Sequence, residues 1–300
     1  MRIVQGIQSG KPCVLALGTF DGIHRGHSTL LTETLRRAKE TQTEASVCTF
    51  DRIPAAVLRP EKAIGMLMTA DERMNELERL GFDTVYLMHF DRETADITAE
   101  EFAMSLIGKL RPVRLVVGYD YRFGRNGTGT PEMLQQMGEQ HGFTVTVVPP
   151  VELNGVRISS TGIRQELATG NIRAANELLG YDYSLTGTVV RGKGLGKGLG
   201  FPTANIDVPA EKQLPAYGVY ACELRWGTEA RRAVVNIGLQ PTLPSGKVTV
   251  EAFIPNEEVD LLGREVRLEL RDMIRKEKKF DSVDQLKIQI AEDIKTAGEL

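Results

Sequence analysis

The first half of the chain alternates short apolar runs with segments of helical periodicity. Two of the helical segments follow Thr69 and Thr98, which precede acidic first turns as N-caps do. Nearly continuous apolar strands that alternate with helices predict a parallel sheet covered by helices on both faces. The expected strands lie at residues 14–17, 45–50, 84–88, 115–117 and 144–148, and the expected helices at 28–39, 70–80, 99–110 and 130–140.

The pattern changes after residue 180. Before it, two further helical segments are separated by Gly170 and Asn171, a natural helix stop. From residue 184 to about 270 the runs are short, rich in Val, Ile, Thr and Tyr, and interrupted by Gly and Pro. They predict antiparallel strands of a barrel or a sandwich, in the segments LTGTVV, GVYACEL, RRAVVNIG, VTVEAFI and EVRLEL. A last helix is expected from residue 282 to about 296.

The length of 300 residues is consistent with two domains. The change of pattern predicts the boundary near residues 181–183, which gives domains of residues 1–182 and 183–300. No apolar stretch approaches the ~20 residues that span a bilayer, so no membrane association is expected. The start of the chain lacks the apolar core of a signal peptide. A cytoplasmic location is therefore the simplest expectation.

Charge and cysteine content argue against nucleic-acid-binding, disulfide-rich and zinc-binding proteins. The net charge of −3 argues against a nucleic-acid-binding protein. The basic segment 271–279 is interrupted by acidic residues, and we interpret it as a solvated surface. Cys13, Cys48 and Cys222 are too few and too scattered for a disulfide framework or a zinc site, and two of them lie in apolar strand-like runs where we expect buried thiols.

A candidate anion site follows the first apolar run of the sheet, in the segment GTFDGIHRGH at residues 18–27. A strand that leads through a glycine-bearing turn into a helix presents free backbone N–H groups and the positive end of the helix dipole. Gly22 and Gly26 allow the backbone to approach a ligand closely. His24 and His27 add side-chain donors for phosphate oxygens. Zinc ligation by this pair is the alternative, but the other two histidines of the chain stand in different contexts.

A second helix start carries similar chemistry, in ISSTGIR at residues 158–164. Ser159, Ser160 and Thr161 are good N-cap residues, and capping alone would explain them. Arg164, one turn into the helix, could clamp a polyphosphate. The two stretches together predict one phosphate-binding site.

In this order, the two stretches resemble the HxGH and ISSTxxR motifs of the nucleotidyltransferase superfamily. VVGYDYRFGRNGTGT, at residues 116–130, resembles a segment of bacterial FAD synthetases, and GLGFPTANI, at residues 198–206, is typical of riboflavin kinases. The segment NIGLQPT, at residues 236–242, and the C-terminal segment IRKEKKFDSVDQLKIQI also resemble riboflavin kinases. Nearly the whole chain therefore resembles the bifunctional prokaryotic riboflavin kinase/FMN adenylyltransferases.

The resemblance implies a Rossmann-like nucleotidyltransferase domain, followed by an antiparallel β-barrel riboflavin kinase domain with a C-terminal helix. The first domain would transfer AMP from ATP to FMN, giving FAD and pyrophosphate. Its implied catalytic residues are His24, His27 and Arg164. The residues implied to bind ATP or FMN there are Gly18, Thr19, Phe20, Asp21, Gly22, Gly26, Asp120, Ser160 and Thr161.

The second domain would phosphorylate riboflavin with ATP and Mg²⁺. By resemblance Glu251 is the general base, and Thr203 and Asn205 offer oxygen ligands that suit Mg²⁺. The glycine-rich segment before them could wrap ATP phosphates. The implied contacts with ATP or riboflavin are Gly192, Gly194, Gly196, Lys197, Gly200, Pro202, Thr203 and Asn205.

Several positions depart from the pattern of relatives. Ile53 stands where a histidine is usual, Leu195 where an arginine is usual, and Phe253 where a histidine follows the base. The last two lie near one site, which leaves a second interpretation open, an FMN adenylyltransferase whose barrel only binds flavin or regulates. A flavin-sensing regulator and another nucleotidyltransferase, such as a cytidylyltransferase, are further alternatives. The expected partners are riboflavin, FMN and ATP, and the sequence does not indicate an oligomeric state.

Overall fold

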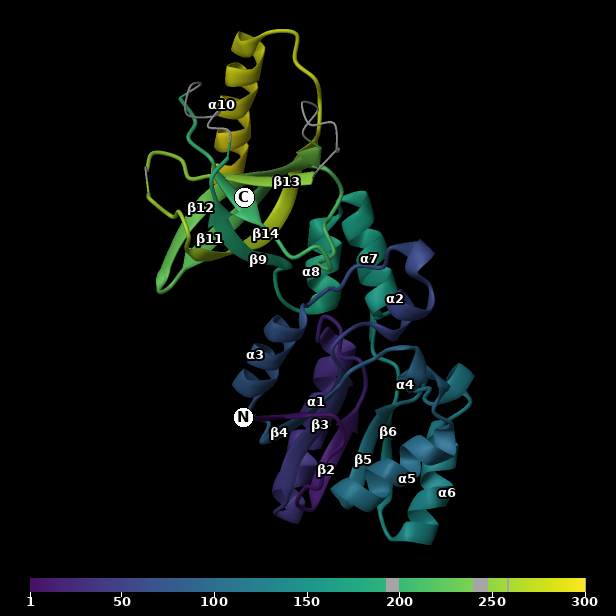
Figure 1. Ribbon diagram of the computed structural model, residues 1–300. Coiled ribbons are helices and arrows are strands. Elements are labelled where there is room, and N and C mark those ends of the chain that lie inside the picture. Colours follow the sequence, from purple (N-terminus) through teal and green to yellow (C-terminus); the bar gives the residue numbers. More distant parts are fainter. Residues whose placement is uncertain (193–199, 240–247, 258, 300) are drawn as a thin grey trace. The chain divides into compact units, whose positions relative to one another are not determined.

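The computed structural model describes residues 1–192, 200–239, 248–257 and 259–299 (Figure 1). The chain divides into two compact units, Met1–Ser160 and Thr161–Leu300. The sequence-based boundary lies some twenty residues later, because two helices that precede the barrel strands group with the second unit. The limits 1–182 and 183–300, as limits of functional domains, stay a prediction.

The first unit is built on a six-stranded sheet with the order β1-β4-β3-β2-β5-β6, in which every neighbouring pair is parallel. This confirms the predicted fold class. The strands are β1 (Arg2–Gln5), β2 (Cys13–Leu17), β3 (Glu44–Phe50), β4 (Thr84–Met88), β5 (Pro112–Gly118) and β6 (Thr144–Val148), and a small hairpin follows, β7 (Glu152–Leu153) and β8 (Val156–Arg157).

Helices cover both faces of this sheet (Figure 1). Leu15 and Leu17 of β2 belong to the core under α5 and α6, whereas Val14 and Ala16 of the same strand belong to the core under α1 and α3. Successive strand residues point to opposite faces, so a strand buried on both sides is apolar throughout. The helical elements are α1 (Arg25–Thr41), α2 (Pro54–Leu58), η1 (Pro60–Lys62), α3 (Ala70–Leu80), α4 (Arg92–Asp96), α5 (Ala99–Leu110), η2 (Arg125–Gly127) and α6 (Pro131–His141).

Local chemistry starts two of these helices as predicted. Thr69 and Thr98 each form a capping box, in which the hydroxyl accepts from the backbone N–H of a glutamate three residues later. The strand order reverses direction between β2 and β5. In open parallel sheets such a reversal leaves a crevice at the carboxyl ends of the strands, where ligands bind.

The second unit is a closed six-stranded barrel with the order β10-β13-β12-β11-β14-β9, which decides between the barrel and the sandwich. A helix pair precedes the barrel and a long helix follows it (Figure 1). The elements are α7 (Ser160–Thr169), α8 (Ile172–Leu179), β9 (Ser184–Val190), β10 (Ala204–Asp207), β11 (Gly218–Trp226), β12 (Glu229–Leu239), β13 (Val248–Phe253), β14 (Glu265–Lys276) and α10 (Val283–Glu299).

Two smaller expectations can be compared with the structure. All three cysteines are free, and all three are buried, whereas burial was expected of two. The basic segment on β14 is more than a solvated surface, because Arg271 pairs with Asp182 and Glu223 and Arg275 pairs with the buried Asp293. Within the part of the chain that the structure describes, every helix is too short or too polar to span a bilayer.

Candidate functional site

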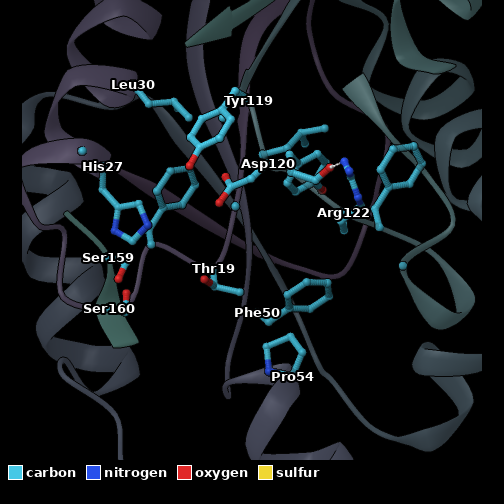
Figure 2. Close-up of a pocket in the computed structure, with 18 of the residues that line it drawn as sticks. Thr19, His27, Leu30, Phe50, Pro54, Tyr119, Asp120, Arg122, Ser159 and Ser160 are labelled. Atoms are coloured by element: carbon cyan, nitrogen blue, oxygen red, sulfur yellow. Dashed lines mark hydrogen bonds between the residues drawn. The ribbon is translucent and has the colours of Figure 1, made fainter. Parts of the chain in front are cut away.

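A cavity of about 870 Å³ lies at the carboxyl edge of the parallel sheet. Segments that follow β2, β3, β4, β5 and β6 all contribute to its wall, as the reversal of strand order predicts. Figure 2 shows His27, Ser159 and Ser160 gathered at one end and Phe50 with Pro54 at another. The cavity therefore has a polar and an aromatic part.

The turn after β2 forms the polar part and has an unusual backbone. Phe20 and Ile23 adopt positive φ values of 49° and 33°, although both are buried non-glycine residues. A β-branched residue at positive φ is strained, and such strain persists only where surrounding contacts enforce it. Those contacts include the Asp21 carboxylate, which accepts from the backbone N–H groups of Leu67 and Met68 at 2.9 and 3.1 Å.

The two histidines of this turn are in contact with each other. His24 is the N-cap of α1, and its Nδ1 accepts from the backbone N–H of His27 at 3.3 Å. An Nδ1 that accepts carries no proton, so neutral His24 holds its proton on Nε2. The rings are stacked with centroids 3.7 Å apart, and Phe20 packs edge-on against His27.

His27 is neutral at physiological pH. Burial lowers its pKa well below the ordinary value, and the neighbouring His24 and Arg73 lower it further. Its Nδ1 is buried without a hydrogen-bond partner among the described residues. Because a buried nitrogen is costly to leave unpaired, it is a candidate contact for a ligand.

The aromatic part of the cavity has walls from three segments. Phe50 and Phe90 pack edge to face at 5.0 Å between centroids, and Tyr121 stacks on Phe123 at 5.5 Å. Phe102 of α5 packs behind Phe123 at 5.7 Å. Such a lining suits a flat aromatic ligand.

Asp120 lies on the cavity wall and forms an ion pair with Arg157 of β8. The guanidinium of Arg157 also lies over the ring of Tyr119, 4.7 Å from its centroid. The Tyr119 hydroxyl is buried and has no hydrogen-bond partner among the described residues. Asp120 was predicted from the sequence, whereas Tyr119 and Arg157 were not, although Tyr119 lies within the segment 116–130 and Arg157 directly precedes ISSTGIR.

The cavity collects most of the candidate residues of the first domain. Gly18, Thr19, Phe20, His24, Gly26, His27, Asp120 and Ser160 line it. Asp21 and Gly22 lie outside this lining, although the Asp21 carbonyl accepts from the Ser160 hydroxyl at 3.0 Å. Thr161 and Arg164 stand on α7, and their roles stay predictions.

A second cavity of about 440 Å³ lies in the barrel unit and includes Gly192, Pro202 and Thr203 in its wall. Beside it, Asn205 of β10 is the cross-strand partner of Glu251 on β13. The Asn205 amide lies against Gly192, where an added Cβ would fall 2.1 Å from its Nδ2. Gly200, at φ 88°, lies outside the lining, while Gly194, Gly196 and Lys197 lie outside the described residues.

The donor set beside this cavity can be compared with what Mg²⁺ requires. No group of three His, Cys, Asp or Glu that could hold a metal occurs among the described residues. Thr203 and Asn205 instead offer neutral oxygens. Mg²⁺ commonly takes few protein ligands and completes its shell with water and substrate phosphates, so the set fits that ion.

Comparison with known proteins covers both units. The family model for FAD synthetase matches residues 7–162, and the model for riboflavin kinase matches residues 179–300. A bifunctional riboflavin kinase/FMN adenylyltransferase from Escherichia coli strain K12 is 39% identical over all of this chain and 97% of its own length. One from Haemophilus influenzae is 34% identical over 99% of this chain and 98% of its own.

A solved structure agrees over the full length. A Streptococcus pneumoniae protein, described as a macrolide-efflux protein, matches with a TM-score of 0.90 and 31% identity over 100% of both chains. Efflux is said of that protein alone. Two family models in tandem, and relatives that share the whole length, establish the membership of this chain. It belongs to the family of bifunctional riboflavin kinase/FMN adenylyltransferases.

Proposed function

We propose that this chain phosphorylates riboflavin to FMN in its barrel unit and transfers AMP from ATP to FMN in its first unit. The observation that carries the proposal is the tandem match to both families along one chain, with full-length relatives named for both activities. The two cavities, one in each unit, are consistent with two separate reactions.

Adenylyl transfer joins two phosphate groups. An oxygen of the FMN phosphate attacks the α-phosphorus of ATP, the bond to the β-phosphate oxygen breaks, and pyrophosphate leaves. The attacking phosphate is already anionic at neutral pH, so alignment and charge stabilisation suffice. Neutral His24 and His27 are donors for the oxygens on which charge develops. We assign the same task to Arg164 and Thr161 from their motif.

The two parts of the first cavity divide the substrates. The aromatic part around Phe50, Phe90 and Phe123 suits the isoalloxazine ring of FMN. The polar part around the histidines, Thr19 and Ser160 suits the phosphates of ATP. In this assignment the FMN phosphate and the ATP α-phosphate meet between the two parts.

Riboflavin phosphorylation needs a base, because a neutral ribityl hydroxyl must lose its proton as it attacks the γ-phosphorus. We assign that role to Glu251. Thr203 and Asn205 would hold Mg²⁺, which supplies charge neutralisation at the phosphates when bound. ADP leaves as the bond to its β-phosphate oxygen breaks.

Chromatography of products tests the proposal. The pure protein is incubated with ATP and Mg²⁺ and either riboflavin or FMN. FAD from both reactions is the expected result. FAD from FMN alone, with riboflavin unchanged, would favour an adenylyltransferase whose barrel lacks kinase chemistry.

Variants assign each reaction to its site. Glu251→Gln should stop FMN formation from riboflavin and leave FAD formation from FMN intact. His24→Asn should stop FAD formation from FMN and leave FMN formation from riboflavin intact. Addition of EDTA tests Mg²⁺, and restored activity with excess Mg²⁺ is the matched control.

A further inference from the structure

A buried arginine lies beneath the first cavity. Arg73 of α3 is only 1% exposed, on the helix face that also buries Met74 and Leu77. It does not line the cavity. Charged side chains are almost never fully buried unless they are paired or serve a specific purpose.

The guanidinium joins the ends of two neighbouring strands. Its Nη1 donates to the carbonyl of Thr19, just after β2, at 2.9 Å, and its Nη2 donates to the carbonyl of Phe50, the last residue of β3. The Thr49 hydroxyl donates to the same Thr19 carbonyl at 3.0 Å. Asp21 and Asp51 attract the buried charge through space.

These two strand ends belong to the two parts of the cavity. Thr19 follows β2 in the turn that carries the histidines, and Phe50 ends β3 in the aromatic wall. A rigid planar fork that grips both carbonyls therefore fixes the spacing between the polar and the aromatic part. Transfer between two bound substrates depends on that spacing, because a displacement of about 1 Å can cost a factor of 10² in rate.

We infer that Arg73 is a positioning residue of adenylyl transfer, which holds the phosphate-binding turn and the aromatic wall at the spacing that the reaction requires. The inference rests on the proposed function of the first cavity. Arg73 acts through Thr19 and Phe50 rather than by contact with substrate.

Loss of the guanidinium takes one donor from the part-buried carbonyls of Thr19 and Phe50, so Arg73→Met should lower the melting temperature. A purely structural role would change the melting temperature alone. The kinetics of the variant, measured below its melting transition, therefore separate the two roles.

Steady-state kinetics of FAD formation from FMN and ATP give the decisive readout. In Arg73→Met we expect kcat to fall by about 30-fold or more, with both KM values within about threefold of the parent, because alignment rather than substrate binding is lost. Arg73→Lys keeps the charge but cannot grip both carbonyls as a fork, so it should recover only part of kcat. Riboflavin phosphorylation by the same preparations should be unchanged, which shows that the barrel unit is intact, and denaturant unfolding shows whether the first unit is folded.

Arg114→Met is the matched control. Arg114 lies on β5 of the same sheet and donates to the Thr146 hydroxyl at 2.9 Å, away from the cavity wall. It should show the parent kcat for FAD formation.

Two results would overturn the inference. One is a kcat for folded Arg73→Met within about threefold of the parent, since alignment would then not depend on the fork. The other is a rise in KM with kcat unchanged, which would show a binding role. If Arg73→Met does not fold, Arg73→Lys decides alone, and parental kcat in that variant overturns the inference. Failure of the unaltered protein to form FAD would instead overturn the proposed function.

Discussion

The imidazole rings of His24 and His27 are stacked, with their centroids 3.7 Å apart and their planes inclined by 14°. Two positive charges at this distance would repel each other strongly in a buried site. The Nδ1 of His24 already accepts from the His27 backbone, which favours its neutral form. The pair therefore supplies neutral donors rather than a fixed positive charge, and this has a measurable consequence for stability.

The free energy of unfolding of the first unit should decrease as the pH is lowered, because of His27. Its pKa in the folded protein lies well below 6.5, while the unfolded chain titrates near 6.5. Below that pH the unfolded state binds a proton that the folded state does not. The contribution of His27 to the free energy of unfolding is therefore complete well above pH 6.5. As the pH falls below 6.5, it decreases by up to about 1.4 kcal/mol per pH unit.

Denaturant unfolding at pH 7.5, 6.5 and 5.5 measures this slope. His27→Gln should have a smaller pH slope than the parent over that range. His141→Gln alters an exposed histidine of the same unit and serves as the control. An equal slope in the parent and His27→Gln would show that His27 titrates normally in the folded protein.

The buried hydroxyl of Tyr119 should cost stability in the free protein and favour binding of the nucleotide. Because it has no partner among the described residues, the folded protein bears an uncompensated desolvation cost. Tyr119→Phe should leave the free energy of unfolding unchanged or raise it by about 1 kcal/mol. The same variant should raise KM for ATP in FAD formation about fivefold, if a bound nucleotide supplies the missing partner.

Tyr217→Phe, which alters an exposed side chain of the barrel unit, is the control for that measurement. A loss of more than about 1 kcal/mol in Tyr119→Phe would mean that the hydroxyl already has a partner in the folded protein. An unchanged KM with unchanged stability would remove Tyr119 from the nucleotide site.

The strands and helices of both units were largely predictable because their signals are local. The expected segments at 84–88 and 70–80 coincide with β4 and α3, whose apolar run and N-cap are contained in the segments themselves. The strand β10 was not predicted as a strand. Its residues Ala204–Asp207 are stabilised by pairing with β9 and β13, which are distant in sequence.

In the first cavity too, residues with a local signal were predicted and residues that depend on distant segments were not. His24 and Ser160 were found from motifs, since a helix N-terminus is a local feature. Arg73 was missed, although one signal existed, namely an arginine among the apolar positions of an amphipathic helix beside Met74 and Leu77. Its partners, the carbonyls of Thr19 and Phe50, come from other strands, and only the folded sheet brings them together.

Gly192 should be indispensable for the kinase reaction. A Cβ at this position would fall 2.1 Å from the Nδ2 of Asn205, too close for any real contact. Gly192→Ala must therefore displace the Asn205 side chain that we assign to Mg²⁺. Riboflavin phosphorylation should fall by a factor on the order of 10², with FAD formation from FMN unchanged.

Gly298→Ala in α10 is the control, because a Cβ there meets open space. Equal rates of riboflavin phosphorylation in Gly192→Ala and the parent would exclude Asn205 from the reaction. Reduced rates in both reactions would indicate a general folding defect instead.

The C-terminal helix should depend on one buried ion pair. Asp293 of α10 is 2% exposed, and its carboxylate accepts from Nε and Nη2 of Arg275 on β14 at 2.8–3.1 Å. Loss of one partner leaves an uncompensated buried charge, so Asp293→Asn should lower the free energy of unfolding of the barrel unit by about 3 kcal/mol. Denaturant unfolding measures the loss, and hydrogen exchange should show reduced protection in α10 first.

The exposed neighbour Glu292 gives the control variant Glu292→Gln, for which a change within about 0.5 kcal/mol is expected. Equal stability of the two variants would mean that apolar packing, rather than this pair, holds α10 on the barrel.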